Sequence, residues 1–331
     1  MKVNITDIAK QLGVSKTTVS FVLNGKGNQK NISSQTQKRI QDLAKKVNYI
    51  PNFSARTLKQ GNTKTIAYLV PDISNPFFAR LGRKIESLLA EHGYHLFFSS
   101  TNEDEKKEES LITSFLARQI DGIIMASTNL NSQTIKNLIE IKIPIVFFDR
   151  FNENIDSNFI TVENKESMKR AVNTLFTDKK VKIGLLSLTP DIHPLKSRID
   201  GYLLAFSERN KKINTDLIRT VDYDNLKDST KNEMKYLLDT GVDYIVFTNN
   251  LIATEAIWIV NKFYPDLVHS LKFVCFDNID MFDYAYPRVT SLAQPLDSMS
   301  LQIVDVLLEN INNIEMPKKR LTIDPIIINR N

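Results

Sequence analysis

The sequence predicts an α/β protein in which a small helical headpiece precedes two lobes of doubly wound parallel sheet. From Thr65 onward, short and almost continuously apolar runs alternate with helical stretches, a pattern typical of parallel sheets covered on both faces. Residues 1–60 show only helical patterns. They hold 11 Lys+Arg against 2 Asp+Glu, whereas the remainder holds 32 against 36. A basic segment of this kind attracts the phosphate backbone of double-stranded DNA.

Composition sets the broad class of protein. The chain has 331 residues, 42% of them hydrophobic and 24% charged, which is typical of a soluble globular protein with more than one domain. No apolar run approaches the roughly 18 residues of a membrane span, and the N-terminus lacks a signal-peptide core. The single cysteine, Cys275, excludes an intramolecular disulfide and a multi-thiolate metal site. We therefore expect a cytoplasmic protein with no membrane contact and no metal.

The segment from Gly13 to Asn24 predicts a helix-turn-helix. An amphipathic helix precedes it, Gly13 has the backbone freedom that a tight turn needs, and Ser15 can cap the second helix. On that second helix the inward positions are Val19, Val22 and Leu23, and the outward positions are Lys16, Thr17, Ser20 and Phe21. The alternative is an ordinary helical hairpin, although the basic charge on this segment favours DNA binding.

A third helix and a short linking segment complete the N-terminal part. Ser33 or Ser34 can cap the third helix, and its apolar stripe closes a three-helix core before Pro51 enforces a break. The stripe consists of Ile40, Leu43, Ala44 and Val47. Residues 52–59 are too few for a stable free helix, so a helix there needs another chain or DNA as its partner. We expect a headpiece over 1–50, a hinge helix and linker over 51–61, and a core over 62–331.

Polar residues follow several of the predicted core strands, at the point where each strand ends. These strand ends read Pro71-Asp72, Asp149-Arg150, Thr248-Asn249-Asn250 and Asp277-Asn278. Asp and Asn suit turns in any case, so each position alone has a simpler explanation as loop capping. Ligands of doubly wound folds bind beyond the carboxyl ends of the strands, however, and four such ends together favour a cleft for a polar ligand between the lobes.

Motifs for catalysis are absent from the sequence. It contains no Gly-x-Gly-x-x-Gly phosphate loop, no Walker lysine pattern, no His-Glu-x-x-His helix and no serine in a nucleophile elbow. The four histidines are scattered, and nothing in the sequence sets the separation of Asp149 and Asp277, the one conceivable pair of catalytic carboxylates. A two-lobed sugar or nucleotide enzyme is therefore the minor alternative, and we expect no cofactor.

Several motifs together resemble the lac/gal repressor family over nearly the whole chain. They are Gly13-Val14-Ser15, Thr18-Val19-Ser20, Tyr49-Ile50-Pro51-Asn52, Ala55-Arg56-Thr57-Leu58, Ser74-Asn75-Pro76-Phe77-Phe78, Asp121-Gly122-Ile123-Ile124, Arg198 with Gly201-Tyr202, and Phe276-Asp277-Asn278. The loop over 24–30, residues 118–121 and residues 144–150 look similar to the fructose-repressor branch. The resemblance implies a repressor of carbohydrate-related genes that binds a pseudo-palindromic operator as a homodimer. It also implies that the core is periplasmic-binding-protein-like.

The resemblance further implies which residues contact DNA. Lys16, Thr17 and Phe21 would face base edges in the major groove, although partial packing of Phe21 against the third helix is an equal alternative. The hinge would enter the minor groove with Leu58 as a wedge between base pairs. The full set of implied DNA-contacting residues is Lys16, Thr17, Thr18, Ser20, Phe21, Lys26, Lys30, Ala55, Arg56 and Leu58. With no leucine heptad near Asn331, a dimer is the expected limit of assembly.

The same resemblance implies an allosteric effector between the lobes. The implied effector-binding residues are Asp72, Phe78, Asp149, Arg150, Arg198, Asn249, Asp277 and Gln294. The N-lobe would comprise 62–160 and 292–322, and the C-lobe 161–291 and 323–331. Arg150, Arg198 and Lys196 could hold a phosphate, but arginine also serves neutral sugars, so a sugar and a sugar phosphate both stay open. A non-sugar effector, a co-repressor and a required partner protein are also open alternatives.

Overall fold

The computed structural model describes residues 3–49, 62–150, 152, 154–176, 181–189 and 192–330, and it divides the chain into two compact units, Met1–Thr63 and Lys64–Asn331. The expected hinge over 52–59 lies outside the described residues, so its helix and its boundaries stay predictions. In the described part of the chain, no helix is long and apolar enough to cross a membrane.

The first unit is a three-helix headpiece. Its elements are α1 (Ile5–Leu12), α2 (Lys16–Leu23), the short 3₁₀ helix η1 (Asn28–Lys30) and α3 (Ser34–Lys46). Gly13 has a φ of 65° after α1, in the left-handed region that glycine adopts most easily, and the hydroxyls of Ser15 and Ser33 accept amide hydrogen bonds at the starts of α2 and α3. These features confirm the turn and both caps that the sequence predicts.

The headpiece core consists of small and branched side chains from all three helices. Its buried members are Ile8, Ala9, Val19, Val22, Ile40 and Ala44, with Leu23, Leu43 and Val47 packed against them. Because the inward positions of α2 and α3 are used in this core, the helices present their remaining, mostly polar faces outward. The predicted apolar stripes are confirmed.

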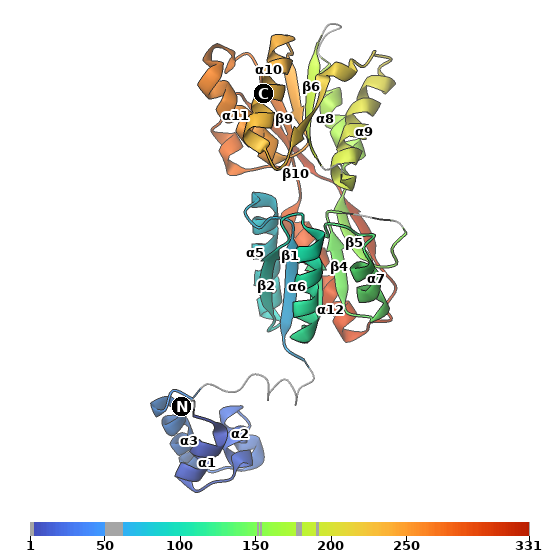
Figure 1. Ribbon diagram of the computed structural model, residues 1–331. Coiled ribbons are helices and arrows are strands. Elements are labelled where there is room, and N and C mark those ends of the chain that lie inside the picture. Colours follow the sequence, from blue (N-terminus) through green and yellow to red (C-terminus); the bar gives the residue numbers. More distant parts are fainter. Residues whose placement is uncertain are drawn as a thin grey trace. The chain divides into compact units, whose positions relative to one another are not determined.

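The second unit contains two lobes, each built on a six-stranded sheet (Figure 1). The N-lobe sheet has the order β11-β5-β4-β3-β1-β2, and all its pairings are parallel. Its strands are β1 (Thr65–Val70), β2 (His95–Ser100), β3 (Gly122–Met125), β4 (Ile145–Phe148), β5 (Asn158–Val162) and β11 (Arg320–Ile323). Helices α5 (Pro76–Glu91) and α12 (Leu296–Asn312) cover one face, while α6 (Glu105–Ala117) and α7 (Gln133–Glu140) cover the other.

The C-lobe sheet has the order β12-β10-β9-β8-β6-β7. Its strands are β6 (Ile183–Thr189), β7 (Ile218–Asp222), β8 (Tyr244–Phe247), β9 (Lys272–Phe276), β10 (Val289–Ala293) and the antiparallel edge strand β12 (Ile326–Ile328). Helices α8 (Lys165–Asn173) and α9 (His193–Glu208) pack on one face, and α10 (Leu226–Asp239) and α11 (Asn250–Phe263) on the other. Three short 3₁₀ helices, η2 (Thr215–Leu217), η3 (Pro265–Leu267) and η4 (Asp280–Asp283), complete this lobe.

The chain passes between the lobes three times, from β5 to α8, from β10 to α12 and from β11 to β12. Each lobe is therefore assembled from separate segments of the sequence, as the mixed colours of the N-lobe in Figure 1 show. The last helix of the core, α12, returns to the N-lobe and packs against α5. Four strands end at the space between the lobes: β1 and β4 of the N-lobe, and β8 and β9 of the C-lobe. Residues that follow their carboxyl ends line the same cavity.

Candidate functional site

Both lobes contribute to one cavity at the carboxyl ends of their strands, which we call the cleft. It is lined by all eight residues that the sequence analysis assigns to an effector: Asp72, Phe78, Asp149, Arg150, Arg198, Asn249, Asp277 and Gln294. All of them except Asp72 are buried. The structure therefore brings the set together, and its role in effector binding stays a prediction.

The N-lobe side of the cleft begins where β1 ends. The carboxylate of Asp72 accepts hydrogen bonds from the backbone N–H and the hydroxyl of Ser74, at 2.8 and 2.7 Å. Asn75 then caps α5 by accepting from the N–H of Phe77. The cap fixes the first turn of α5, which places the rings of Phe77 and Phe78 against the cleft, 5.0 Å apart between centroids. These rings supply the apolar wall on which a sugar ring can stack.

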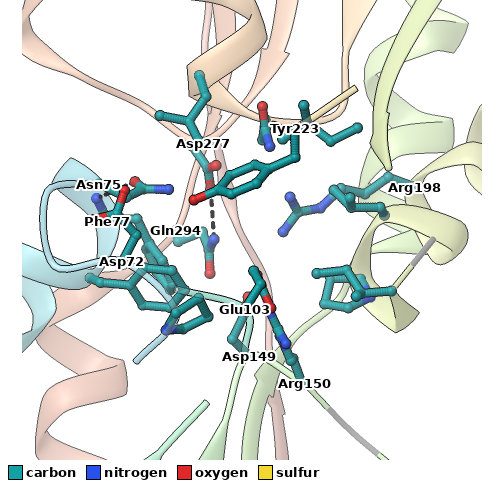
Figure 2. A pocket seen from close by; sticks show the side chains of 18 of the residues that line it. Asp72, Asn75, Phe77, Glu103, Asp149, Arg150, Arg198, Tyr223, Asp277 and Gln294 are labelled. Carbon is teal, nitrogen blue, oxygen red and sulfur yellow. Dashed lines mark hydrogen bonds and ion pairs between the residues drawn. The ribbon is translucent and has the colours of Figure 1, made fainter. Parts of the chain in front are cut away.

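The end of β4 carries a buried cluster of charges. The Arg150 guanidinium forms an ion pair with Glu103, and its Nη1 donates to the carbonyl of Ser127 at 2.8 Å. Asp149 precedes it with a φ of 63°. Burial raises the pKa of the Asp149 carboxyl to about 6, and the positive charges of Arg198 and Arg150 oppose that rise. Figure 2 shows Glu103, Asp149 and Arg150 grouped at one end of the cleft.

On the C-lobe side, Arg198 is held in a fixed position by α9. Its Nε donates to the side-chain oxygen of Asn164 at 2.8 Å, and its Nη1 donates to the carbonyl of Thr248 at 2.7 Å. The guanidinium also stacks over the ring of Phe276, 3.7 Å from the centroid. Asn164 lies in the crossing between β5 and α8, so Arg198 connects that crossing to the end of β8.

Asp277 and Gln294 lie opposite this cluster, and the amide Nε2 of Gln294 donates to Asp277 at 2.7 Å (Figure 2). The Oε1 of Gln294 and the Nε of Arg150 are both buried, and neither has a hydrogen-bond partner among the described residues. Unpaired buried polar atoms are costly. One of these atoms is an acceptor and the other a donor, so a hydroxyl, which both donates and accepts, matches them.

Four polar residues of the cleft are missing from the sequence-based set: Asn75, Glu103, Thr189 and Tyr223. Asn75 and Glu103 follow strands that the apolar runs do identify, so the same strand-end rule could have found them. Tyr223 follows β7, a strand without an apolar run. The structure also corrects one expectation. Lys196 is exposed on α9 and does not line the cleft, so it offers no charge to a bound phosphate.

The headpiece carries the second candidate surface, along the outer face of α2. Lys16 and Thr17 are exposed at its first turn, and α2 has no acidic residue there. Thr18 and Ser20 already have internal partners, because their hydroxyls hydrogen-bond with Ser15 and Asn24. Helix α2 thus offers an unobstructed basic first turn.

Phe21 is half-buried, and the exposed Lys30 lies over its ring with Nζ 5.3 Å from the centroid. Lys26 is exposed in the loop before η1. The remaining expected DNA contacts, Ala55, Arg56 and Leu58, lie outside the described residues. All the DNA-contacting assignments stay predictions.

Comparisons with known proteins match both parts of the chain. Residues 66–279 match the periplasmic binding protein domain family, and residues 4–52 match the bacterial regulatory proteins of the lacI family. The sucrose operon repressor of Lactococcus lactis subsp. lactis is 32% identical over 312 residues, which cover 94% of this chain and 94% of that protein.

Solved structures of regulators share the fold. The transcriptional regulator CelR in complex with cellobiose superposes with a TM-score of 0.71 at 21% identity, covering 99% of each chain. The Cra transcriptional dual regulator of Pseudomonas putida, in complex with fructose 1-phosphate, has a TM-score of 0.72 at 18% identity and covers 81% of this chain and 99% of that one. The matching relatives and structures named here are transcriptional regulators rather than enzymes.

Proposed function

The chain belongs to the lacI family of bacterial regulatory proteins, and we propose that it represses carbohydrate-related genes under the control of a sugar or sugar phosphate bound in the cleft. A repressor of this kind acts in the cytoplasm, where bacterial DNA lies. It would bind a pseudo-palindromic operator as a homodimer, because two copies of one headpiece match two half-sites related by a two-fold axis.

The observation that carries the effector assignment is the pair of unpaired buried atoms in the cleft, Arg150 Nε and Gln294 Oε1. They accompany carboxylates and guanidiniums from both lobes. A ligand that bonds to both lobes has a different affinity for each arrangement of the lobes. That difference is the free energy by which it can change the affinity of the protein for DNA.

For the DNA-binding surface, we assign the major-groove contacts to Lys16 and Thr17, with Phe21 offering its ring to a thymine methyl group. The exposure of the first turn of α2 supports this assignment. The stacked Lys30 would direct a positive charge at the phosphate backbone beside Phe21.

The test combines DNA binding with an effector titration. An operator is selected from random double-stranded DNA with the intact protein, and its affinity is measured by fluorescence anisotropy at several salt concentrations. We expect Lys16→Ala to weaken operator binding by about tenfold or more, because a base contact is worth roughly 1–3 kcal/mol. Lys45→Ala on α3, also exposed, is the matched control and should have a smaller effect.

The same assay then receives neutral sugars and sugar phosphates. A change in operator affinity with any of them supports the effector assignment, and its direction tells whether the effector induces or co-represses. Operator affinity that no sugar or sugar phosphate alters would contradict the assignment. Equal effects of Lys16→Ala and Lys45→Ala would contradict the role of α2.

A further inference from the structure

A second cavity, which we call the annex, opens beside the N-lobe end of the cleft. Its distinctive lining consists of Thr128 and four asparagines, Asn129, Asn131, Asn152 and Asn154. Arg150 and Ile192 line both the annex and the cleft, so the two spaces adjoin. No family motif in the sequence and no part of the proposed effector site includes these asparagines.

The sizes of the two spaces differ. The cleft has a volume of about 80 Å³, and the annex has a volume of about 450 Å³. Sites for small organic ligands usually have volumes of about 300–1,000 Å³. The cleft alone falls below that range, whereas the annex lies within it. A ligand that occupies the cleft can therefore extend past Arg150 into the annex.

Three of the four amides of the annex, those of Asn129, Asn131 and Asn152, are held by hydrogen bonds. Asn129 donates its Nδ2 to Glu105 at 3.0 Å and accepts from the N–H of Asn131 at 2.9 Å. Asn152 donates its Nδ2 to the Oδ1 of Asn131 at 2.7 Å and accepts from the N–H of Asn154 at 3.0 Å. An asparagine amide can form about four hydrogen bonds, so capacity for a ligand remains on groups that are already oriented.

The backbone beneath the annex is also fixed. The buried carboxylate of Glu108 accepts from the hydroxyl of Ser127 and from the N–H of Thr128, both at 2.7 Å. The Thr128 hydroxyl in turn bonds that of Thr101 at 2.9 Å. Because the carbonyl of Ser127 accepts from Arg150, the same turn that carries the annex also positions the guanidinium of the cleft.

The charges that line the cleft disfavour an anionic ligand there. Four carboxylates line the cleft, those of Asp72, Glu103, Asp149 and Asp277, against the guanidiniums of Arg150 and Arg198. Arg150 is already paired with Glu103, and Arg198 is engaged by Asn164, Thr248 and the ring of Phe276. The lining of the cleft already carries more carboxylates than guanidiniums, so a phosphate dianion would meet repulsion there, whereas hydroxyls can donate to those carboxylates.

We propose that the annex is a second carbohydrate subsite, and that the effector is an uncharged sugar of at least two linked rings. One ring lies in the cleft against Phe78, with hydroxyls on Gln294 and the Asp carboxylates. The next ring lies in the annex, with hydroxyls on the amides of Asn131 and Asn152. This inference rests on the proposed effector function and narrows it from a sugar or sugar phosphate to a neutral oligosaccharide.

The test varies ring number and charge independently. Binding to the intact protein is measured by isothermal titration calorimetry with glucose, glucose 6-phosphate, fructose 1-phosphate, trehalose and trehalose 6-phosphate. Sucrose, maltose and cellobiose are added to vary the linkage between the rings. We expect at least one neutral disaccharide to bind about tenfold or more tightly than glucose and than every phosphorylated sugar, since a few extra hydrogen bonds give that factor.

Variants of the annex then locate the second ring. Asn131→Ala and Asn152→Ala should each weaken the tightest disaccharide by about tenfold, while glucose binding changes by less than about twofold. Asn137→Ala is the matched control, because Asn137 is an exposed asparagine on the neighbouring helix α7 and does not line the annex. The thermal melt of each variant verifies that it is folded.

The outcomes separate this inference from the function on which it rests. Tighter binding of a phosphorylated sugar, or equal binding of glucose and all disaccharides, would overturn the inference and leave a sugar effector in place. Disaccharide binding that both annex variants retain would overturn the annex as the second subsite. If no sugar of either kind binds, the inference and the proposed effector both fail.

Discussion

Helix α2 of the headpiece and the cleft between the lobes both present polar side chains, but in opposite states of burial. Lys16 and Thr17 on α2 are exposed, whereas Asp149, Arg198 and Asp277 are 7%, 3% and 6% exposed. An exposed polar group can be removed at little cost to folding, because water replaces its partner. A buried one that is bonded inside the fold serves folding and binding together. Substitutions should therefore separate binding from stability in the headpiece and combine them in the cleft.

The largest effect is expected at Arg198. Arg198→Ala removes two hydrogen bonds from a charged donor and the stacking on Phe276, so it should lower the free energy of unfolding by about 3 kcal/mol or more. It should also abolish the response of operator binding to the effector. The guanidinium bonds both Asn164, in the segment that passes between the lobes from β5 to α8, and the carbonyl of Thr248 at the end of β8. Chemical denaturation of the core and anisotropy with effector measure the two results.

Arg209→Ala provides the matched control for Arg198. Arg209 follows the same helix, α9, but it is exposed. It donates hydrogen bonds to the side-chain oxygen and the carbonyl of Asn173 and lies over the ring of Phe176. Its loss should cost less than about 1 kcal/mol and should leave the effector response intact. If Arg198→Ala kept both its stability and its response, the cleft would behave like the exposed surface of α2, and the comparison would be wrong.

An intermediate effect, with a defined pH dependence, is expected at Asp149. Its pKa is about 6 in the folded protein, above the value of about 3.9 for an unperturbed aspartate. The folded state thus binds the proton more tightly, so stability should fall as the pH rises from about 4 to about 6. At about 1.4 kcal/mol for each pKa unit, Asp149→Asn should be more stable than the parent by roughly 2–3 kcal/mol at pH 7.

Two features sharpen this test. Asparagine tolerates the positive φ of Asp149, so the substitution changes charge with little strain. Asp156→Asn, at an exposed aspartate of the same lobe, is the control and should change stability by less than about 0.5 kcal/mol. Melting temperatures of the parent and both variants between pH 4 and 8 provide the measurement. A parallel pH dependence in Asp149→Asn and the parent would show that Asp149 does not titrate in this range.

The same contrast in burial explains how much of the structure and the site the sequence could predict. Apolar runs reveal buried strands, so they identify β1, β4, β8 and β9, and with them the strand ends that carry Asp72, Asp149, Asn249 and Asp277. The edge strand β7, with the sequence IRTVD, has no such run, because it is only partly buried. The sequence pattern therefore does not indicate its neighbour Tyr223.

Local sequence patterns also do not predict which residues far apart in the chain pair with each other. Arg150 looked available for a phosphate, but it pairs with Glu103, which lies 47 residues earlier and reaches it only through the parallel sheet. The antiparallel edge strand β12 is three residues long and follows the last crossing between the lobes. Local patterns indicate which segments are buried. They do not indicate which polar groups use one another as partners, and those pairings determine what the cleft has left to offer a ligand.

The smallest effect is expected in the headpiece, at the cap of α2. The hydroxyl of Ser15 accepts the N–H of Thr18 at 3.0 Å, and loss of such a cap costs about 1 kcal/mol. Ser15→Ala should therefore accelerate amide hydrogen exchange at Thr18 about fivefold and leave the exchange of the core sheets unchanged, because the headpiece is a separate compact unit.

Ser34→Ala, at the first position of α3 rather than at its cap, is the control and should have little effect on exchange in its helix. Faster exchange in the core sheets of Ser15→Ala would mean that the exposed and buried regions share one cooperative unit. The separation of binding from stability in the headpiece would then not hold.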